Sequence, residues 1–152
     1  MEEAGIYAIE SSYLDHYVQI GVASGRVINL AFPGSPDDDA GTEHPVLNRI
    51  QRYLEGANEN FADVETALTM PTDRRQVLET LRGIPYGEQV SVERLVRMTP
   101  NLDPDEEDDI ETARAALAAN PIPLIIPDHR VRDGPSGAPP DVEQKLRSLE
   151  NL

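Results

Sequence analysis

The sequence contains no cysteine and only one lysine, Lys145, among its 152 residues. Without a thiol, the chain has no disulfide scaffold, no thiolate metal site and no cysteine nucleophile. No apolar run approaches the roughly 20 residues that a membrane-spanning helix needs, and no signal peptide opens the chain. We therefore expect a soluble, cytoplasmic protein, and its 39% of hydrophobic residues can build a core.

Acidic residues outnumber basic ones by 28 to 13, which gives a formal net charge of −15. The excess is not a tail: residues 1–70 carry 12 acidic and three basic residues, and residues 71–152 carry 16 and 10. A carboxylate-rich, lysine-poor composition is typical of a halophilic protein whose surface stays hydrated in concentrated salt. The alternative is an acidic protein that does not bind nucleic acid, so that its negative charge, which repels nucleic acid, has no cost. Neither interpretation excludes DNA binding by a local basic patch.

The first half of the chain predicts a small α/β domain over residues 1–71. Three short apolar runs predict strands, at residues 6–10, 17–23 and 27–32. Ser24-Gly25 predicts the turn between the last two strands. Beyond a loop rich in Gly, Pro and Asp, apolar residues recur at helical spacing from Pro45 to Gly56.

The second half, residues 72–152, predicts a helical domain. Its helical patterns fall at residues 72–83, 91–98, 110–119 and 142–149. Thr72 or Asp73 can cap the first of these helices, and Ser91 can cap the second. The second and third are short and are joined by a loop, so they can form a helix-turn-helix.

The acidic run at residues 103–109 is not a calcium loop, because its sixth position is Asp108 instead of Gly and its twelfth is Arg114 instead of Glu. Acidic residues ahead of a helix are favoured by the helix dipole. No Gly-rich phosphate loop is present. The three histidines lack the spacing of metal ligands: His16, His44 and His129. We predict no metal and no cofactor.

Asp128, His129 and Arg130 follow the most apolar short run of the chain, residues 122–127, which is bounded by Pro127. Three polar residues at this point would lie at the edge of the core that the apolar run enters. From the residues alone, both a structural salt-bridge cluster and a functional pocket remain open. An acid–base pair of Asp128 and His129 is a further option, but side chains of adjacent residues rarely face each other.

Three segments carry a family resemblance: residues 84–91 (IPYGEQVS), 120–127 (NPIPLIIP) and 129–131 (HRV). In order and spacing they resemble the O6-alkylguanine-DNA alkyltransferase family, and residues 6–12 resemble its amino-terminal domain. The resemblance implies a small ribonuclease-H-like α/β domain packed on a helical domain with a winged-helix or helix-turn-helix-like DNA-binding fold. In that family a cysteine in a Pro-Cys-His-Arg motif irreversibly takes the alkyl group from a flipped-out guanine.

Carried over by resemblance, several functional positions are altered. Asp128 stands at the acceptor cysteine, Val92 at the tyrosine that helps rotate the base, and Glu111 at the arginine finger. Arg114 lies one turn beyond Glu111 and could substitute for the finger only if the helix register has shifted. The resemblance places the carboxylate that polarises the histidine at Leu152, and it shortens the substrate loop to residues 133–140. The retained positions are Asn120, His129 and Arg130.

The altered positions argue against alkyl transfer. A carboxylate is ionised without help, with a reference pKa of about 3.9, but it is a much poorer nucleophile than a thiolate. A methyl ester on Asp128 would also be hydrolysable. Glu111 places a negative charge where the family meets DNA, beside the acidic run, and phosphate repulsion opposes binding.

Three functional hypotheses follow. The first is a catalytically inactive homologue with weakened or lost DNA binding, monomeric, that serves a protein partner. The second is an alkyltransferase-like protein of DNA repair that binds double-stranded DNA with alkylated guanine. The third is a guanine or guanine-nucleotide reader that uses the two oxygens of Asp128. A continuous basic surface would favour the DNA-binding hypothesis. Its residues would be Arg94, Arg97, Arg114, Arg130 and Arg132.

Overall fold

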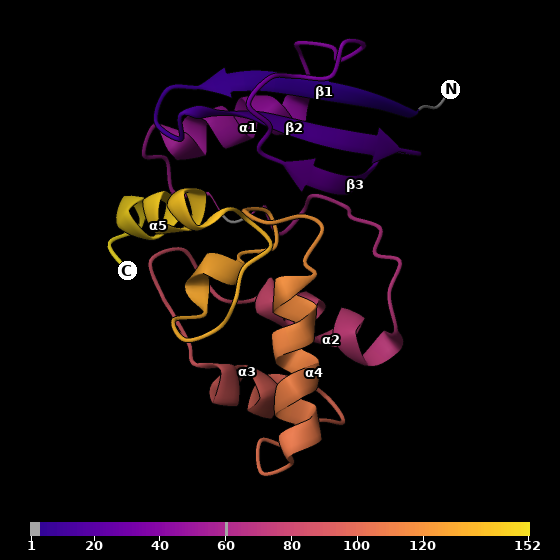
Figure 1. Cartoon of the computed structure of the whole chain (residues 1–152), viewed down its shortest axis with the longest axis vertical. Helices are drawn as coiled ribbons and strands as arrows, with labels where there is room; N and C mark the ends of the chain where they lie inside the picture. The colour runs from indigo at the N-terminus through magenta and orange to yellow at the C-terminus, as the bar shows by residue number, and fades with distance from the viewer. Residues whose placement is uncertain (1–3, 60) are drawn as a thin grey trace. The chain divides into compact units, whose positions relative to one another are not determined.

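The computed structural model describes residues 4–59 and 61–152 and divides into two compact units, Met1–Ala67 and Leu68–Leu152 (Figure 1). Together the described residues form a three-stranded antiparallel sheet and five α-helices, an α/β fold. No helix in the described part of the chain is both long enough and apolar enough to cross a membrane.

The first unit contains the predicted sheet and helix. Its elements are β1 (Ala4–Ser11), β2 (His16–Ala23), β3 (Arg26–Ala31) and α1 (Pro45–Leu54). The strands pair in the order β1-β2-β3, and Ser24 and Gly25 both take positive φ in the turn between β2 and β3. That conformation suits a tight hairpin, as the Ser-Gly pair predicts.

The core of the first unit is built from buried apolar residues that recur at strand spacing on β2 and at helical spacing on α1. Alternate residues of β2, among them Val18 and Ile20, are fully buried, as the period of two of a strand requires. On α1, Leu47 and Ile50 recur at helical spacing and are also fully buried. The Nδ1 atom of His44 accepts a hydrogen bond from the backbone N–H of Val46 and so caps α1.

The second unit is helical, as predicted. Its elements are α2 (Thr72–Leu81), α3 (Val92–Met98), α4 (Glu107–Ala118), the single 3-10 turn η1 (Asp128–Arg130) and α5 (Pro140–Leu149). Helices α2, α3 and α4 pack on one another. Ser91 caps α3 as predicted, because its hydroxyl accepts a hydrogen bond from the N–H of Arg94.

Two helix starts differ from the prediction. The N-cap of α2 is Pro71, and Thr72 and Asp73 lie inside the first turn, where the Asp73 carboxylate accepts from the N–H of Arg74 at 2.8 Å. Helix α4 begins at Glu107, inside the acidic run, and not at residue 110. Acidic side chains in a first helical turn interact favourably with the positive end of the dipole, so the acidic run extends α4 instead of merely preceding it.

Candidate site around Asp128

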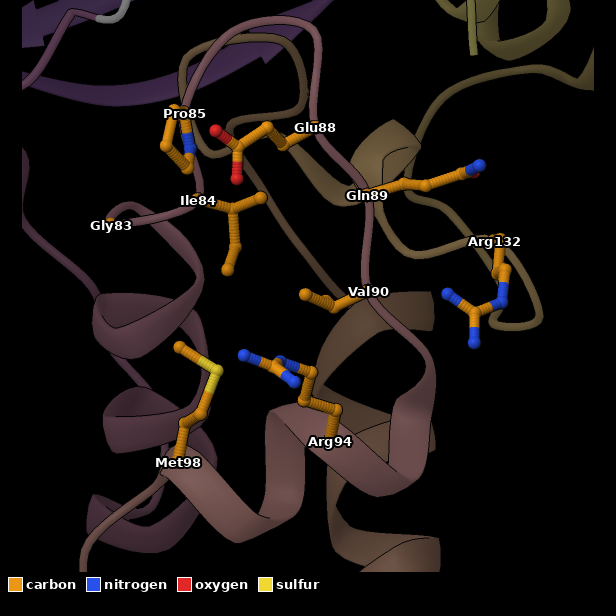
Figure 2. Close-up of a pocket in the computed structure, with 9 residues that line it drawn as sticks. All are labelled: Gly83, Ile84, Pro85, Glu88, Gln89, Val90, Arg94, Met98 and Arg132. Carbon is orange, nitrogen blue, oxygen red and sulfur yellow. The ribbon is translucent and has the colours of Figure 1, made fainter.

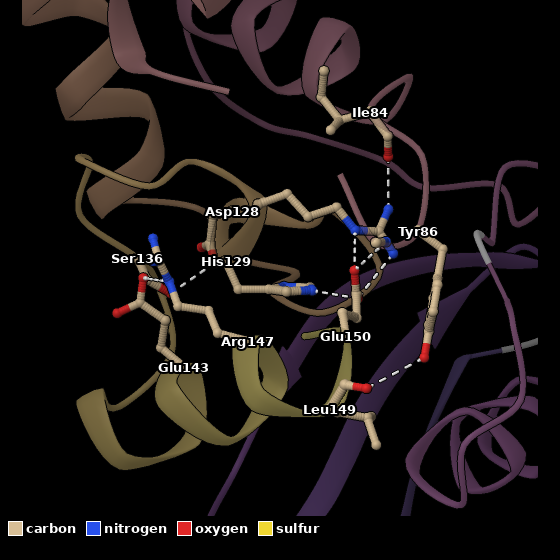
Figure 3. Close-up of polar contacts among 11 residues, drawn as sticks. Ile84, Tyr86, Asp128, His129, Ser136, Glu143, Arg147, Leu149 and Glu150 are labelled. Carbon is tan, nitrogen blue, oxygen red and sulfur yellow. Dashed lines mark hydrogen bonds and ion pairs between the residues drawn. The ribbon is translucent and has the colours of Figure 1, made fainter. Parts of the chain in front are cut away.

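Asp128 begins η1 and is completely buried, with 0% of its surface exposed. Three donors converge on its carboxylate, of which Figure 3 shows Ser136. The Ser136 hydroxyl donates to Oδ1 at 2.7 Å, the Gly137 N–H donates to Oδ2 at 2.7 Å, and the Asn120 side-chain amide donates to Oδ2 at 3.0 Å. Burial raises the pKa of Asp128 above its ordinary value, and the three hydrogen bonds oppose that rise in part.

Asn120 shapes the loop that delivers Asp128 to this position. Its Oδ1 atom accepts from the N–H of Ile122, and its Nδ2 atom donates to the carbonyl of Ile126 as well as to Asp128. Ile122 and Ile126 are fully buried. The apolar run is therefore folded back on a buried asparagine, and the polar residues that follow it are carried into the core and not to its surface.

The segment 133–140 lies over Asp128. Ser136 and Gly137 both donate to the carboxylate, and the Ser136 hydroxyl also accepts from the N–H of Ala138. At Gly137 an added Cβ would overlap the carbonyl oxygen of Asn120. The shortened loop is thus closed down on the carboxylate at a glycine that leaves no room for a side chain.

We expect Gly137→Ala to reduce the free energy of unfolding by about 1–3 kcal/mol, the usual cost of overpacking. The cause is the contact with the Asn120 carbonyl, which belongs to backbone and cannot swing aside. Gly34→Ala is the matched control, because an added Cβ there meets nothing within 4 Å. Denaturant titration of both variants measures the effect, and equal stability of the two would show that the loop is not closed as described.

His129 points away from Asp128 toward Glu150 (Figure 3), and Arg130 binds the same carboxylate. The Glu150 carboxylate accepts from His129 Nε2 at 2.7 Å, and from Arg130 Nε and Nη2 at 2.8 and 3.0 Å. Its Oε1 atom also accepts from the Gly87 N–H at 3.0 Å. All three side chains are almost completely buried. Arg130 further donates from Nη1 to the carbonyl of Ile84 at 2.7 Å.

Glu150 is ionised in this arrangement. Burial alone would raise its pKa, but the hydrogen bonds from His129 and Arg130 outweigh burial and lower the pKa well below the ordinary value. An ionised carboxylate only accepts hydrogen bonds, so His129 donates from Nε2 and carries a proton there.

The histidine-binding carboxylate is a correction to the sequence prediction, which placed it at Leu152. The structure puts Glu150 there, two residues earlier. The available signal was its spacing from the amphipathic α5: Glu150, the C-cap residue, follows the buried Leu146 by four residues. Sequence reasoning also missed Ser136 and Gly137, whose contacts depend on how the loop folds.

Of the four positions predicted for DNA binding, Asn120 contacts Asp128, whereas the other three lie elsewhere. Val92 is buried at the start of α3, and its N–H donates to the Asp133 carboxylate at 2.8 Å. Arg114 donates to the carbonyl of Asp133 at 3.3 Å. Glu111 lies exposed on α4. The structure therefore brings together Asn120 and Asp128 in one cluster and His129 and Arg130 in another, while Val92 and Arg114 both hold the start of the 133–140 loop.

The expected basic face is incomplete. Arg130 is 2% exposed and bound to Glu150, so it does not belong to any surface. Arg94, Arg97 and Arg132 are exposed. Within residues 4–59 and 61–152, no group of three or more His, Cys, Asp or Glu side chains is placed to hold a metal ion.

Comparison with known proteins agrees with this architecture. Residues 72–151 match the family model described as 6-O-methylguanine DNA methyltransferase, DNA binding domain. A methylated-DNA–protein-cysteine methyltransferase of Methanopyrus kandleri is 30% identical over 129 residues, covering 82% of this chain and 93% of that protein. A probable enzyme of the same name from Acanthamoeba polyphaga mimivirus is 26% identical over 106 residues, 68% of each chain.

Solved structures show the same fold at lower identity. Mycobacterium tuberculosis OGT in complex with DNA superposes with a TM-score of 0.70 at 22% identity, covering 97% of this chain and 91% of that one. The O6-methylguanine-DNA methyltransferase of Pyrococcus kodakaraensis superposes with a TM-score of 0.67 at 19% identity, covering 99% and 100%. The fold is thus that of the O6-methylguanine methyltransferases. With the family match over more than half of its length, the chain belongs to the O6-methylguanine-DNA methyltransferase family.

Proposed function

We propose that this chain is a member of the family that does not transfer alkyl groups, in which Asp128 at the acceptor position has become a structural residue. The observation that carries the proposal is the carboxylate itself. It is 0% exposed and accepts three hydrogen bonds, two of them from the loop that covers it. The chain also contains no cysteine that could replace it as the acceptor.

The burial of the Asp128 carboxylate argues against nucleophilic attack by this side chain on an alkyl group. A nucleophile must come within roughly 3–3.5 Å of the atom it attacks, and neither oxygen of this buried carboxylate is open to an incoming group. The raised pKa favours the neutral form, which is less nucleophilic still. The same geometry counts against a guanine reader, because the oxygens it would need already accept hydrogen bonds from Asn120, Ser136 and Gly137.

For the two domains we propose a ribonuclease-H-like fold over residues 1–71 and a helix-turn-helix-like fold over residues 72–152, formed by α3 and α4. The family model that residues 72–151 match, described as a DNA binding domain, supports a DNA-facing ancestry for the second domain. Glu111 is exposed on α4, in the position that resemblance gives to the arginine finger. A negative charge there, next to the acidic run, weakens binding to phosphate-rich DNA, and we propose that a protein partner has replaced DNA.

The test combines an alkyl-transfer assay with a binding assay. The full chain is incubated with duplex DNA whose O6-methylguanine carries a labelled methyl group, and anisotropy of lesion-containing and plain duplexes is followed from low to molar KCl. We expect no label on the protein and no preference for the lesion. A labelled protein would contradict the loss of transfer. A preference for the lesion would favour the alkyltransferase-like hypothesis instead.

Charge reversal at Glu111 shows whether this position suppresses DNA binding. Glu111→Arg should bind plain duplex more tightly than the wild-type chain at low salt, with the gain fading as salt screens it. Glu43→Arg is the matched control, because it changes the net charge equally at an exposed position of the first unit. Equal gains in the two variants would assign the effect to net charge alone and remove Glu111 from the argument.

A further inference from the structure

A cavity of about 340 Å³ lies in the second unit, between α3, the segment 83–90 and Arg132 (Figure 2). Its apolar part comes from Ile84 and Val90, which are buried, and from Met98, which is 43% exposed. Arg94 and Met98 rise from the same side of α3, one helical turn apart, toward Ile84 and Val90 (Figure 2). An exposed methionine beside buried aliphatic side chains is an adaptable apolar contact surface.

Two arginines line this cavity without a carboxylate partner. In the described part of the chain, no acidic side chain lies within ion-pair distance of Arg94 or Arg132. Other arginines of this strongly acidic protein are paired, as Arg49 is with Glu59 and Asp63. Two unpaired guanidinium groups on one small cavity therefore form a local cationic site on an otherwise negative chain.

The backbone under the site is held in place. The Val90 N–H donates to the carbonyl of Arg130 at 2.8 Å, and the Arg132 N–H donates to the carbonyl of Val90 at 2.9 Å. Arg130 is itself fixed by Glu150. The backbone at Val90 and Arg132 is thus held in place through Arg130 and the buried ionic cluster. Binding of a ligand here orders side chains but not the main chain, and the entropic cost of binding is therefore lower.

We propose that this cavity binds an acidic peptide segment of a protein partner, with an aliphatic side chain against Ile84, Val90 and Met98 and flanking carboxylates on Arg94 and Arg132. Carboxylate is the group that an arginine fork pairs with most directly. The cavity has room for one such aliphatic side chain and the groups beside it. The apolar contact persists in concentrated salt, where an interaction made of charges alone is screened.

The same site suits nucleic acid poorly. Glu88 lines the cavity and adds a negative charge beside the two arginines. A duplex presents a continuous line of phosphates, so it would meet both Glu88 and the chain's net charge of −15. A short peptide that carries two carboxylates around one aliphatic residue brings far less negative charge than a duplex, so it meets less of that repulsion, and it uses the apolar part of the cavity.

The experiment is an NMR titration of the full chain, labelled with ¹⁵N and with ¹³C at the methionine methyl groups, with the pentapeptide Gly-Glu-Leu-Asp-Gly. We expect the Nε–Hε resonances of Arg94 and Arg132 and the methyl resonance of Met98 to shift. The amide peptide Gly-Gln-Leu-Asn-Gly tests the carboxylates, and Gly-Glu-Ala-Asp-Gly tests the aliphatic side chain. Both should bind more weakly. Absence of shifts at these three residues with the acidic peptide overturns the proposal.

Paired variants make the assignment specific. The double variant Arg94→Gln/Arg132→Gln should weaken peptide binding about tenfold or more, whereas Arg97→Gln should change it less than about twofold. Arg97 is the matched control, because it is an exposed arginine on the same helix that does not line the cavity. A short DNA duplex is titrated in parallel. Shifts of the same resonances by the duplex, lost in the double variant, would assign the site to nucleic acid and contradict the peptide.

Discussion

Replacing Glu150 by glutamine is expected to destabilise the protein by about 3–5 kcal/mol, the usual cost of removing one partner of a buried ionic cluster. The substitution leaves the Arg130 guanidinium buried without its counter-charge, and it turns an amide N–H₂ toward donors that need an acceptor. The loss extends beyond one ion pair because the Gly87 N–H also donates to this carboxylate. Three segments distant in sequence are therefore joined at Glu150.

Glu79→Gln is the matched control. Glu79 faces Arg75 on α2 at 3.9 Å, and the side chains are 60% and 40% exposed, respectively. A pair of this kind contributes at most about 1 kcal/mol. Denaturant titration of the two variants at one salt concentration measures both effects. If Glu150→Gln costs no more than Glu79→Gln, the buried cluster does not stabilise the fold.

The pH dependence of the Glu150 effect has a defined sign. The pKa of Glu150 is lower in the folded chain than its ordinary value of 4.5. Its ionised form therefore contributes stability that is fully present above pH 4.5 and is lost as the pH falls below that value. The difference between wild type and Glu150→Gln should be constant near neutrality and narrow below pH 4.5. A difference that widens on acidification would contradict the ionised assignment.

The parts of the fold that the sequence predicts are those with local causes. The strands and α1 follow from periodicity and from the Ser24-Gly25 turn, and the cap of α3 follows from Ser91. The sequence predicts the start of α4 at residue 110, three residues late, because the dipole favours acidic residues both ahead of a helix and within its first turn, and the pattern does not distinguish the two.

The parts that could not be predicted depend on contacts between distant segments. Glu150 lies at the end of α5, and only the folded chain shows that it meets His129, 21 residues earlier. From the residues alone, the polar triplet at 128–130 could have been a salt-bridge cluster or a pocket. The structure separates its members: His129 and Arg130 belong to the ionic cluster, whereas Asp128 faces the other way, toward the 133–140 loop.

Asp128 itself should tolerate asparagine but not alanine. Asparagine can place its oxygen where Oδ2 accepts from Asn120 and Gly137, and its amide can donate to the Ser136 hydroxyl. Alanine removes the acceptor of the part-buried Gly137 N–H and of the Ser136 hydroxyl, and each lost hydrogen bond of this kind costs about 0.5–1.5 kcal/mol. Amide hydrogen exchange at Gly137 reports directly on the loop, and we expect loss of protection in Asp128→Ala and its retention in Asp128→Asn.

The pH dependence of folding stability shows whether the folded chain requires the negative charge of Asp128 or only the shape of its side chain. Burial raises the pKa of Asp128 above its ordinary value of 3.8 in the folded chain. The protonated side chain therefore contributes stability that is fully present below pH 3.8. This contribution is lost as the pH rises through the raised pKa. Asparagine does not titrate, and the stability of Asp128→Asn relative to wild type should therefore increase with pH across that range. Denaturation midpoints of the two proteins from acid to neutral pH measure the trend. A trend of opposite sign would mean that the three donors hold Asp128 as a required anion, and that its negative charge, more than its shape, closes the loop.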